Sequence, residues 1–173
     1  MPSGCSRIWK PGDPIPDDMM EFHFLSWITD SIAISAYVVA QDSDVLDLEH
    51  VDSIVSLGEL HPTESGVRHL EWIRKFYDGE EAVDVRDESI SRAVDSVIRL
   101  SSRGRVLVHC AAGVSRSPGV VMLSLCTRDG MSWEDAKRLV TEKRPVANVH
   151  PVLERRLVSW LDANRAGRRK DSG

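Results

Sequence analysis

The chain has 173 residues, of which 42% are hydrophobic and 28% charged, a balance typical of one soluble globular domain and not of a disordered or fibrous chain. Its formal net charge of -5 argues against a nucleic-acid-binding surface, because clustered Lys and Arg supply most of that binding. An anionic ligand would therefore have to be bound by a local site.

The sequence contains no apolar run of about 18 residues, and its N-terminus lacks a basic flank followed by an apolar stretch, so it predicts neither a membrane span nor a signal peptide. The three cysteines Cys5, Cys110 and Cys126 are an odd and sparse set, which indicates free thiols in a reducing compartment. No two of them have the spacing of metal ligands. We therefore expect a cytoplasmic protein that binds no membrane, no metal and no other cofactor.

Proline, glycine and polar residues predict loose ends for the chain. Residues 1–18 carry four prolines and two glycines, and residues 166–173 form a short polar, basic tail. We expect one folded domain at 21–165, preceded by a flexible N-terminal segment at 1–20 and followed by the basic C-terminal tail at 166–173.

Strand patterns dominate the first half of this domain. The segment 31–39 is rich in Ile, Val and Ala, and a short helical stretch at 44–50 leads into a strand at 53–57. A further strand pattern at 67–73 is followed by Asp78-Gly79, a pair that favours turns.

The second half opens with a helix and an apolar strand. Apolar residues from Ile90 to Ile98 recur at i, i+3, i+4, i+7 and i+8, which predicts a helix with one buried face that Gly104 ends. The strand at 105–109 contains the trio Val106-Leu107-Val108, as expected for a central parallel strand covered on both faces. This strand brings Cys110 to its carboxyl end.

Three helices follow this strand. The first has almost no polar face and should be buried, with Ser117 and Pro118 as its N-cap and first-turn residues. The second begins with a pattern that resembles a capping box at Ser132, and it must stop before Pro145. The third is amphipathic and opens at Pro151. Their expected ranges are 118–128, 132–144 and 151–161.

This order of elements predicts an α/β fold, a three-layer sandwich with a central, mostly parallel sheet flanked by helices. In such sheets, ligands bind beyond the carboxyl ends of the strands. The loop after the strand at 105–109 is therefore the expected place for a site.

The 110–116 loop has the features of an anion site. Backbone N–H groups that enter a helix N-terminus form a concave positive nest, and the helix dipole adds to it, so a phosphate can be held largely by main chain. Gly113 allows a conformation that a β-carbon would obstruct. Arg116 can fold back and give two charge-assisted bonds to phosphate oxygens. The predicted phosphate-binding residues are Ala111, Ala112, Gly113, Val114, Ser115 and Arg116.

The same field acts on the thiol of Cys110. A free thiol, of pKa about 8.5, is about 3% thiolate at pH 7, whereas a helix N-terminus and a cation lower the pKa of a cysteine to roughly 3.5–7.5. A thiolate can attack phosphorus and form a covalent cysteinyl-phosphate. We expect Ser117 to hydrogen-bond the sulfur, which would help Cys110 leave in the second step, and His109 to orient the loop by hydrogen bonding.

The segment HCAAGVSRSP resembles the signature loop of the protein tyrosine phosphatase superfamily, His-Cys-x5-Arg-Ser, and its ending is similar to that of the dual-specificity branch. The segment FLSWITDSIAISAYVVAQD is similar to the opening strands of such domains, and Arg144-Pro145 to the break before their final helix. The resemblance covers roughly 24–161. It implies a dual-specificity protein phosphatase that hydrolyses phosphotyrosine, and phosphoserine or phosphothreonine as well, in proteins.

The family also needs an Asp on a separate loop, which protonates the leaving oxygen and then activates water. The candidates are Asp78, Asp84 and Asp87. We favour Asp78, because it follows the strand at 67–73 and stands 32 residues before Cys110, a spacing similar to that in the family. Asp84 lies closer to the next helix, and Asp87 could simply be the N-terminal charge of that helix.

Three other functions are weighed against this one. Phosphatases that act on phosphoinositides tend to place Lys in this loop, where the chain has Ala111 and Ala112. An RNA 5′-triphosphatase is disfavoured by the acidic net charge. A non-catalytic phosphopeptide-binding module on the same fold is disfavoured by the intact Cys110 and Arg116. The expected partner is a phosphorylated protein, with no nucleic acid and no membrane, and a monomer is favoured.

Overall fold

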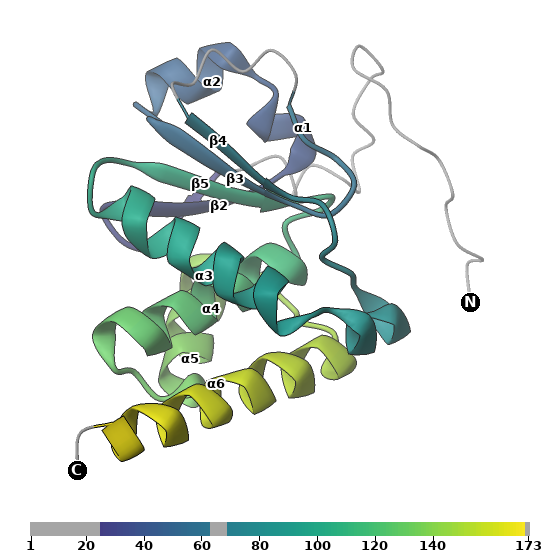
Figure 1. Ribbon diagram of the computed structural model, residues 1–173. Coiled ribbons are helices and arrows are strands. Elements are labelled where there is room, and N and C mark those ends of the chain that lie inside the picture. Colours follow the sequence, from purple (N-terminus) through teal and green to yellow (C-terminus); the bar gives the residue numbers. More distant parts are fainter. Residues whose placement is uncertain (1–24, 63–68, 172–173) are drawn as a thin grey trace.

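The computed structural model describes residues 25–62 and 69–171. Within these residues the chain forms a sheet of order β1-β2-β5-β3-β4 (Figure 1). β1 pairs antiparallel with β2, and all other neighbouring strands are parallel. The strands are β1 (Ser26–Trp27), β2 (Ile32–Ala36), β3 (Ser53–Leu57), β4 (His69–Ile73) and β5 (Val106–Cys110).

Helices cover both faces of the sheet (Figure 1), which confirms the predicted α/β sandwich with a mostly parallel sheet. Two short helices lie on one face and four longer ones on the other. The short helices are α1 (Tyr37–Ala40) and α2 (Ser43–Leu48). The longer ones are α3 (Asp87–Ser101), α4 (Arg116–Asp129), α5 (Trp133–Lys143) and α6 (Pro151–Asp171), and a 3-10 helix, η2 (Gly79–Asp84), precedes α3.

Both faces are apolar because side chains alternate along the central strand β5. Leu107 packs with Ala40 and Leu46 in a small cluster under α1 and α2. Val106 and Val108 belong to the larger cluster between the sheet and the four long helices. This two-sided burial is what the apolar trio in the sequence predicts for a central parallel strand.

α4 is the central helix of the larger layer and packs against α3, α5 and α6. Its residues from Ser117 to Cys126 are all buried, which confirms the prediction of a buried helix. Gly119 faces α6, where a Cβ atom would lie 2.8 Å from Cδ1 of Leu157. The absence of a side chain at Gly119 therefore lets α4 and α6 approach closely.

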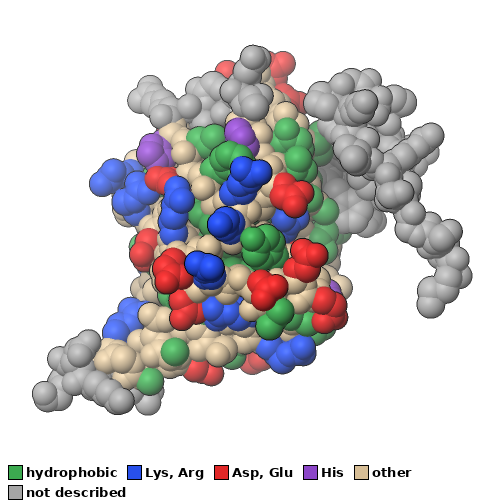
Figure 2. Space-filling view, turned by 45° about the vertical axis from the view of Figure 1, so that its right-hand side comes forward, with side chains coloured by type: hydrophobic (Ala, Val, Ile, Leu, Met, Phe, Trp, Pro, Cys, Tyr) green, Lys and Arg blue, Asp and Glu red, His purple; other side chains and the backbone are tan. Residues whose placement is uncertain are grey.

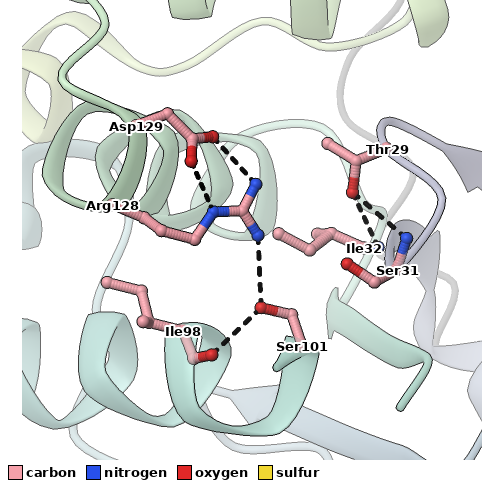
Figure 3. A network of polar contacts seen from close by, with 7 residues as sticks. All are labelled: Thr29, Ser31, Ile32, Ile98, Ser101, Arg128 and Asp129. Carbon is pink, nitrogen blue, oxygen red and sulfur yellow. Dashed lines mark hydrogen bonds and ion pairs between the residues drawn. The ribbon is translucent and has the colours of Figure 1, made fainter. Parts of the chain in front are cut away.

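Polar side-chain contacts connect the carboxyl ends of α3 and α4 (Figure 3). Arg128 pairs with Asp129 through Nε at 2.7 Å and through Nη2 at 2.8 Å, and its Nη1 donates to Ser101 Oγ at 3.4 Å. In the turn between β1 and β2, Thr29 Oγ1 accepts a hydrogen bond from the backbone N–H of Ile32 at 3.0 Å. These side chains stabilise the scaffold and take no part in the loop that carries the chemistry.

Three predicted boundaries were wrong. β2 ends at Ala36, where the chain turns into α1, and does not continue to 39. α4 begins at Arg116, so Ser117 lies in its first turn and is not the N-cap. α6 extends past 161 to Asp171, into the tail predicted to be loose, because no proline follows and a single Gly167 does not stop a helix. The second helix agrees better with the sequence: Ser132 Oγ accepts from the backbone N–H of Asp135 at 3.1 Å, as a capping box requires.

Some expectations lie outside the described residues. These are the flexible segment 1–20, the first residues of the domain at 21–24, and positions 67–68 of the strand that ends at Ile73. The domain limits at 21 and 165 stay predictions.

The visible face in Figure 2 carries basic and acidic side chains side by side, with hydrophobic ones scattered among them. Four large hydrophobic side chains are exposed among the described residues, and they come from separate elements: Leu48, Leu60, Leu70 and Val83. Of the helices in the described part of the chain, none combines the length and the hydropathy that crossing a membrane would require.

Candidate active site

The 110–116 loop lies at the carboxyl ends of the parallel strands. Cys110 ends β5, the strand between β2 and β3. Its side chain is only 2% exposed, whereas Ala111 and Ala112 are exposed. The backbone N–H of Tyr37, just after β2, donates to Ala111 O at 3.0 Å. The sulfur therefore lies below the exposed part of a loop that is anchored to the neighbouring strand.

Ser117 contacts the sulfur as the sequence predicts. Its Oγ lies 3.2 Å from Cys110 Sγ, and the Ser117 side chain is fully buried. The Ser117 hydroxyl thus faces the sulfur from the first turn of α4. A hydroxyl can donate to a thiolate there, so the arrangement can stabilise negative charge on Cys110.

His109 orients the loop from beneath. The ring is fully buried, with Nε2 at 2.7 Å from Ser56 Oγ and Nδ1 at 3.1 Å from Cys110 O. Because a carbonyl can only accept, Nδ1 carries the proton and Nε2 accepts from the hydroxyl of Ser56. Burial lowers the pKa of His109 to about 4, and the charge of Arg116 adds to this effect. The imidazole is therefore neutral at pH 7 and acts as a hydrogen-bonding support, which agrees with the sequence prediction.

The guanidinium of Arg116 lies against the turn that follows β3. A Cβ atom on Gly58, which has φ +95°, would overlap Nη1 of Arg116 and lie 3.2 Å from its Cζ. Trp72 on β4 holds this turn, because its Nε1 donates to Gly58 O at 2.8 Å. Within the described residues, the buried Nε of Arg116 donates to no protein acceptor. A ligand with negatively charged oxygens in the loop would provide that acceptor.

A second arginine, Arg144, holds the middle of the loop. Gly113 has φ +67°, and a Cβ atom there would lie 2.6 Å from both Ser35 O and Arg144 Nη2. Arg144 is 1% exposed, and it donates from Nε to Gly113 O at 2.7 Å and from Nη1 to Ser26 Oγ at 3.0 Å. Burial lowers the pKa of Arg144, and the negative form of nearby Cys110 opposes that shift. The Gly113 carbonyl is thus turned toward Arg144, away from the anion side of the loop.

Sequence reasoning missed three of these supports. The sequence patterns identify Arg144 only as the residue before the proline that ends a helix, and they single out no role for Gly58. Ser56 carried a usable signal, because a serine in the middle of a buried parallel strand needs a hydrogen-bond partner. Nothing in the sequence indicates which segments Gly58 and Arg144 contact.

The three candidate acids lie in different surroundings. Asp78 Oδ1 accepts from Ser115 Oγ in the 110–116 loop at 2.7 Å. Asp84, at the end of η2, is exposed. Asp87, in the first turn of α3, forms an ion pair with Arg156 of α6. Among the contacts between described residues, Asp78 is the candidate that touches the loop.

Comparison with known proteins places this geometry in a family. The model of the dual specificity phosphatase catalytic domain matches residues 62–163, more than half of the chain. The chain belongs to the dual specificity phosphatase family. The match contains the 110–116 loop and all three candidate acids of this dual specificity phosphatase, and it ends within α6.

Similar proteins cover most of the chain at modest identity. The chain is 28% identical to dual specificity protein phosphatase 15 of Rattus norvegicus over 130 residues, which are 74% of this chain and 53% of the rat protein. It is 26% identical over 145 residues to human dual specificity protein phosphatase 21, covering 78% and 70% of the two chains. The alignment to human dual specificity protein phosphatase 15 covers only 24% of that protein, so the chain spans about half or less of the human and rat phosphatases 15 that it matches.

The fold has a counterpart among solved structures. The crystal structure of a single-substitution variant of human DUSP28 matches 83% of this chain and 97% of its own, with a TM-score of 0.68 and 25% sequence identity. This match supports the dual specificity phosphatase fold over nearly the whole described region. Within that region, no three His, Cys, Asp or Glu side chains gather in an arrangement that could hold a metal ion.

Proposed function

We propose that this chain hydrolyses phosphotyrosine, and phosphoserine or phosphothreonine as well, in protein substrates through a cysteinyl-phosphate intermediate. The observation that carries the proposal is the contact between Cys110 Sγ and Ser117 Oγ, next to Arg116, whose buried Nε donates to no acceptor among the described residues. A nucleophile, a hydroxyl that stabilises it and a cation for the phosphate thus belong to one contiguous segment, 110–117.

In the first step, the thiolate of Cys110 attacks phosphorus and the bond from phosphorus to the ester oxygen breaks. Arg116 and the loop N–H groups stabilise the equatorial oxygens, and Asp78 transfers a proton to the leaving oxygen. In the second step, a water molecule attacks the phosphorus of the phosphocysteine, Asp78 takes a proton from this water, and the bond from phosphorus to sulfur breaks. The sulfur leaves as a thiolate with the Ser117 hydroxyl bonded to it, and phosphate is released.

The loop composition supports protein substrates over phosphoinositides. Ala111 and Ala112 are exposed and uncharged, so this part of the loop supplies no cation for a second phosphate group of a highly phosphorylated ring. The net charge of -5 disfavours an RNA 5′-triphosphatase. A phosphopeptide-binding module without turnover would not need the Cys110 to Ser117 contact.

Hydrolysis of para-nitrophenyl phosphate in the presence of EDTA tests the proposal. We expect Cys110→Ser to abolish turnover while inorganic phosphate still binds, since the loop amides and Arg116 remain. Cys126→Ala is the matched control, because Cys126 is the other described cysteine and lies in the core of α4. Activity that persists in Cys110→Ser would overturn the proposed mechanism.

A further inference from the structure

Ser115 is the N-cap residue of α4, but its hydroxyl caps nothing. A serine at this position ordinarily has extended backbone angles and accepts from an N–H group of the first helical turn. Here Ser115 has φ −117° and ψ −66°, and no side-chain capping bond is formed. The side chain is 8% exposed. Because buried hydroxyl groups form hydrogen bonds, a serine that does not bond its own helix is expected to have another hydrogen-bond partner.

Asp78 shows the same departure in a separate segment. It is the N-cap of η2, with extended backbone angles suited to capping, but its carboxylate forms no capping bond either. The two side chains bond each other instead, with Ser115 Oγ and Asp78 Oδ1 separated by 2.7 Å. Two helix starts thus give up a local hydrogen bond for one contact between them.

The direction of this hydrogen bond is determined by a third group. The backbone N–H of His150, just before α6, donates to Ser115 Oγ at 2.9 Å. Because that N–H can only donate, the hydroxyl proton of Ser115 is free to point at Asp78. The chain of donors runs from His150 N–H through Ser115 O–H to Asp78 Oδ1.

The remainder of the segment that carries Asp78 is anchored elsewhere. Phe76, Ala82 and Val85 are buried in the core. Arg156 Nε donates to Val85 O at 2.9 Å. These contacts position the backbone on both sides of Asp78, which leaves the orientation of its carboxyl group to Ser115.

We propose that Ser115 is a positioning residue that aims the Asp78 carboxyl at the leaving oxygen. This inference rests on the proposed function, in which Asp78 is the proton donor. Oδ1 accepts from Ser115, so the transferable proton resides on Oδ2, and it is this proton that passes to the leaving oxygen. The Ser115 proton stays on Ser115 throughout and serves to fix which oxygen of Asp78 faces the substrate.

Leaving-group dependence isolates this role, because a general acid matters for a poor leaving group and little for an activated one. The experiment measures kcat/KM for phenyl phosphate and for 2,4-dinitrophenyl phosphate in each variant. We expect Ser115→Ala to lower the phenyl phosphate value about tenfold more than the dinitrophenyl phosphate value. Ser115→Thr, which keeps a hydroxyl, should restore most of the lost ratio. Asp78→Asn should change the ratio more than Ser115→Ala, and adding Ser115→Ala to Asp78→Asn should change it no further.

Ser132→Ala is the matched control, because Ser132 is an N-cap serine that does cap its helix, and its removal should leave the ratio of the two substrates unchanged. If Asp78→Asn leaves the ratio unchanged, the proposed acid is wrong. If Asp78→Asn changes the ratio but Ser115→Ala lowers kcat/KM equally for both substrates, Ser115 only supports the loop. This inference then fails while the proposed function stands.

Discussion

Gly58 and the guanidinium of Arg116 are in direct contact, and there is no room between them for a single methyl group. The two residues come from separate segments, the turn after β3 and the start of α4. Trp72 fixes the turn through its bond to Gly58 O. The position of the Arg116 guanidinium is thus restricted by a turn outside its own loop.

Gly58→Ala should therefore weaken anion binding. The added methyl group must displace Arg116, and we expect the affinity for inorganic phosphate to fall at least about tenfold, the loss of one charge-assisted bond. Isothermal titration with phosphate measures this. Gly130→Ala is the control, because Gly130 also has a positive φ, +70°, but no atom within 4 Å of the added methyl group. Both variants should lose about 1 kcal/mol of unfolding free energy from backbone strain. Equal phosphate affinity in the two variants would contradict the role of Gly58.

Arg144→Met should damage both stability and catalysis. The substitution leaves Gly113 O and Ser26 Oγ without the guanidinium donor, and we expect a loss of about 2–3 kcal/mol in urea unfolding. Because the Gly113 peptide then loses its orientation, kcat/KM for para-nitrophenyl phosphate should fall about tenfold or more. Arg138→Met is the control: Arg138 is an exposed arginine on α5, the helix that ends just before Arg144, and it pairs with Asp135, so its substitution should change neither quantity by much. If Arg144→Met loses stability at full kcat/KM, Arg144 supports the fold and not the loop.

His109 should make the protein less stable in mild acid. Its pKa is about 4 in the folded protein, below the ordinary 6.5, because burial disfavours the charged ring. Between these values the unfolded chain binds more protons, so the contribution is fully present above pH 6.5 and is lost as the pH falls toward 4. The loss amounts to about 3 kcal/mol at most.

Urea unfolding from pH 4.5 to 7.5 measures this effect. We expect His109→Gln to flatten the curve relative to the unsubstituted protein, since glutamine does not titrate. Parallel curves for the two proteins would show that His109 does not carry the effect. Glu71, Glu154 and Asp129 also have lowered pKa values, and they contribute equally to both proteins.

The three candidate acids should separate in pH-rate profiles. Asp78→Asn should lower kcat for para-nitrophenyl phosphate about a hundredfold and remove the basic limb of the profile. Asp87→Asn should keep the basic limb of the profile. It should lower the free energy of unfolding by at most about 1 kcal/mol, because the Asp87 side chain that pairs with Arg156 is exposed. Asp84→Asn should resemble the unsubstituted protein. Loss of the basic limb in Asp84→Asn or Asp87→Asn instead would assign the acid to that residue.

The sequence predicted well what a contiguous segment determines. Local patterns predict the strand at 105–109, the loop and the buried helix. They also predict the contact between Cys110 and Ser117, which are seven positions apart in the sequence. It predicted poorly where segments begin and end, as at Ala36, where the chain turns into α1, and at Arg116, where α4 begins two residues before the predicted start at 118.

Contacts between distant segments were beyond the reach of sequence patterns. The contact of Ser56 with His109 joins residues 53 positions apart, and that of Arg144 with Gly113 joins residues 31 apart. The contact of Gly58 with Arg116 is comparably distant in the sequence, and no periodic pattern predicts such pairs. Asp78 was favoured on its place after the strand at 67–73 and on its spacing to Cys110, whereas its bond to Ser115 joins two loops whose sequence patterns are unrelated. Predicting that bond requires the strand order, which places both loops at the same edge of the sheet.

Gly119 links the packing of α4 against α6 to the surroundings of Asp78. Because it lets α4 and α6 approach, it sets the distance between Ser115 at the start of α4 and His150 just before α6, and it also sets where Arg156 can reach Val85. A larger residue at Gly119 would push α4 and α6 apart and would thereby disturb both anchors of Asp78 at once. Because Arg116 is the first residue of α4, the same displacement would also reach the 110–116 loop, so the packing of these two helices and the geometry of the loop are coupled in this fold.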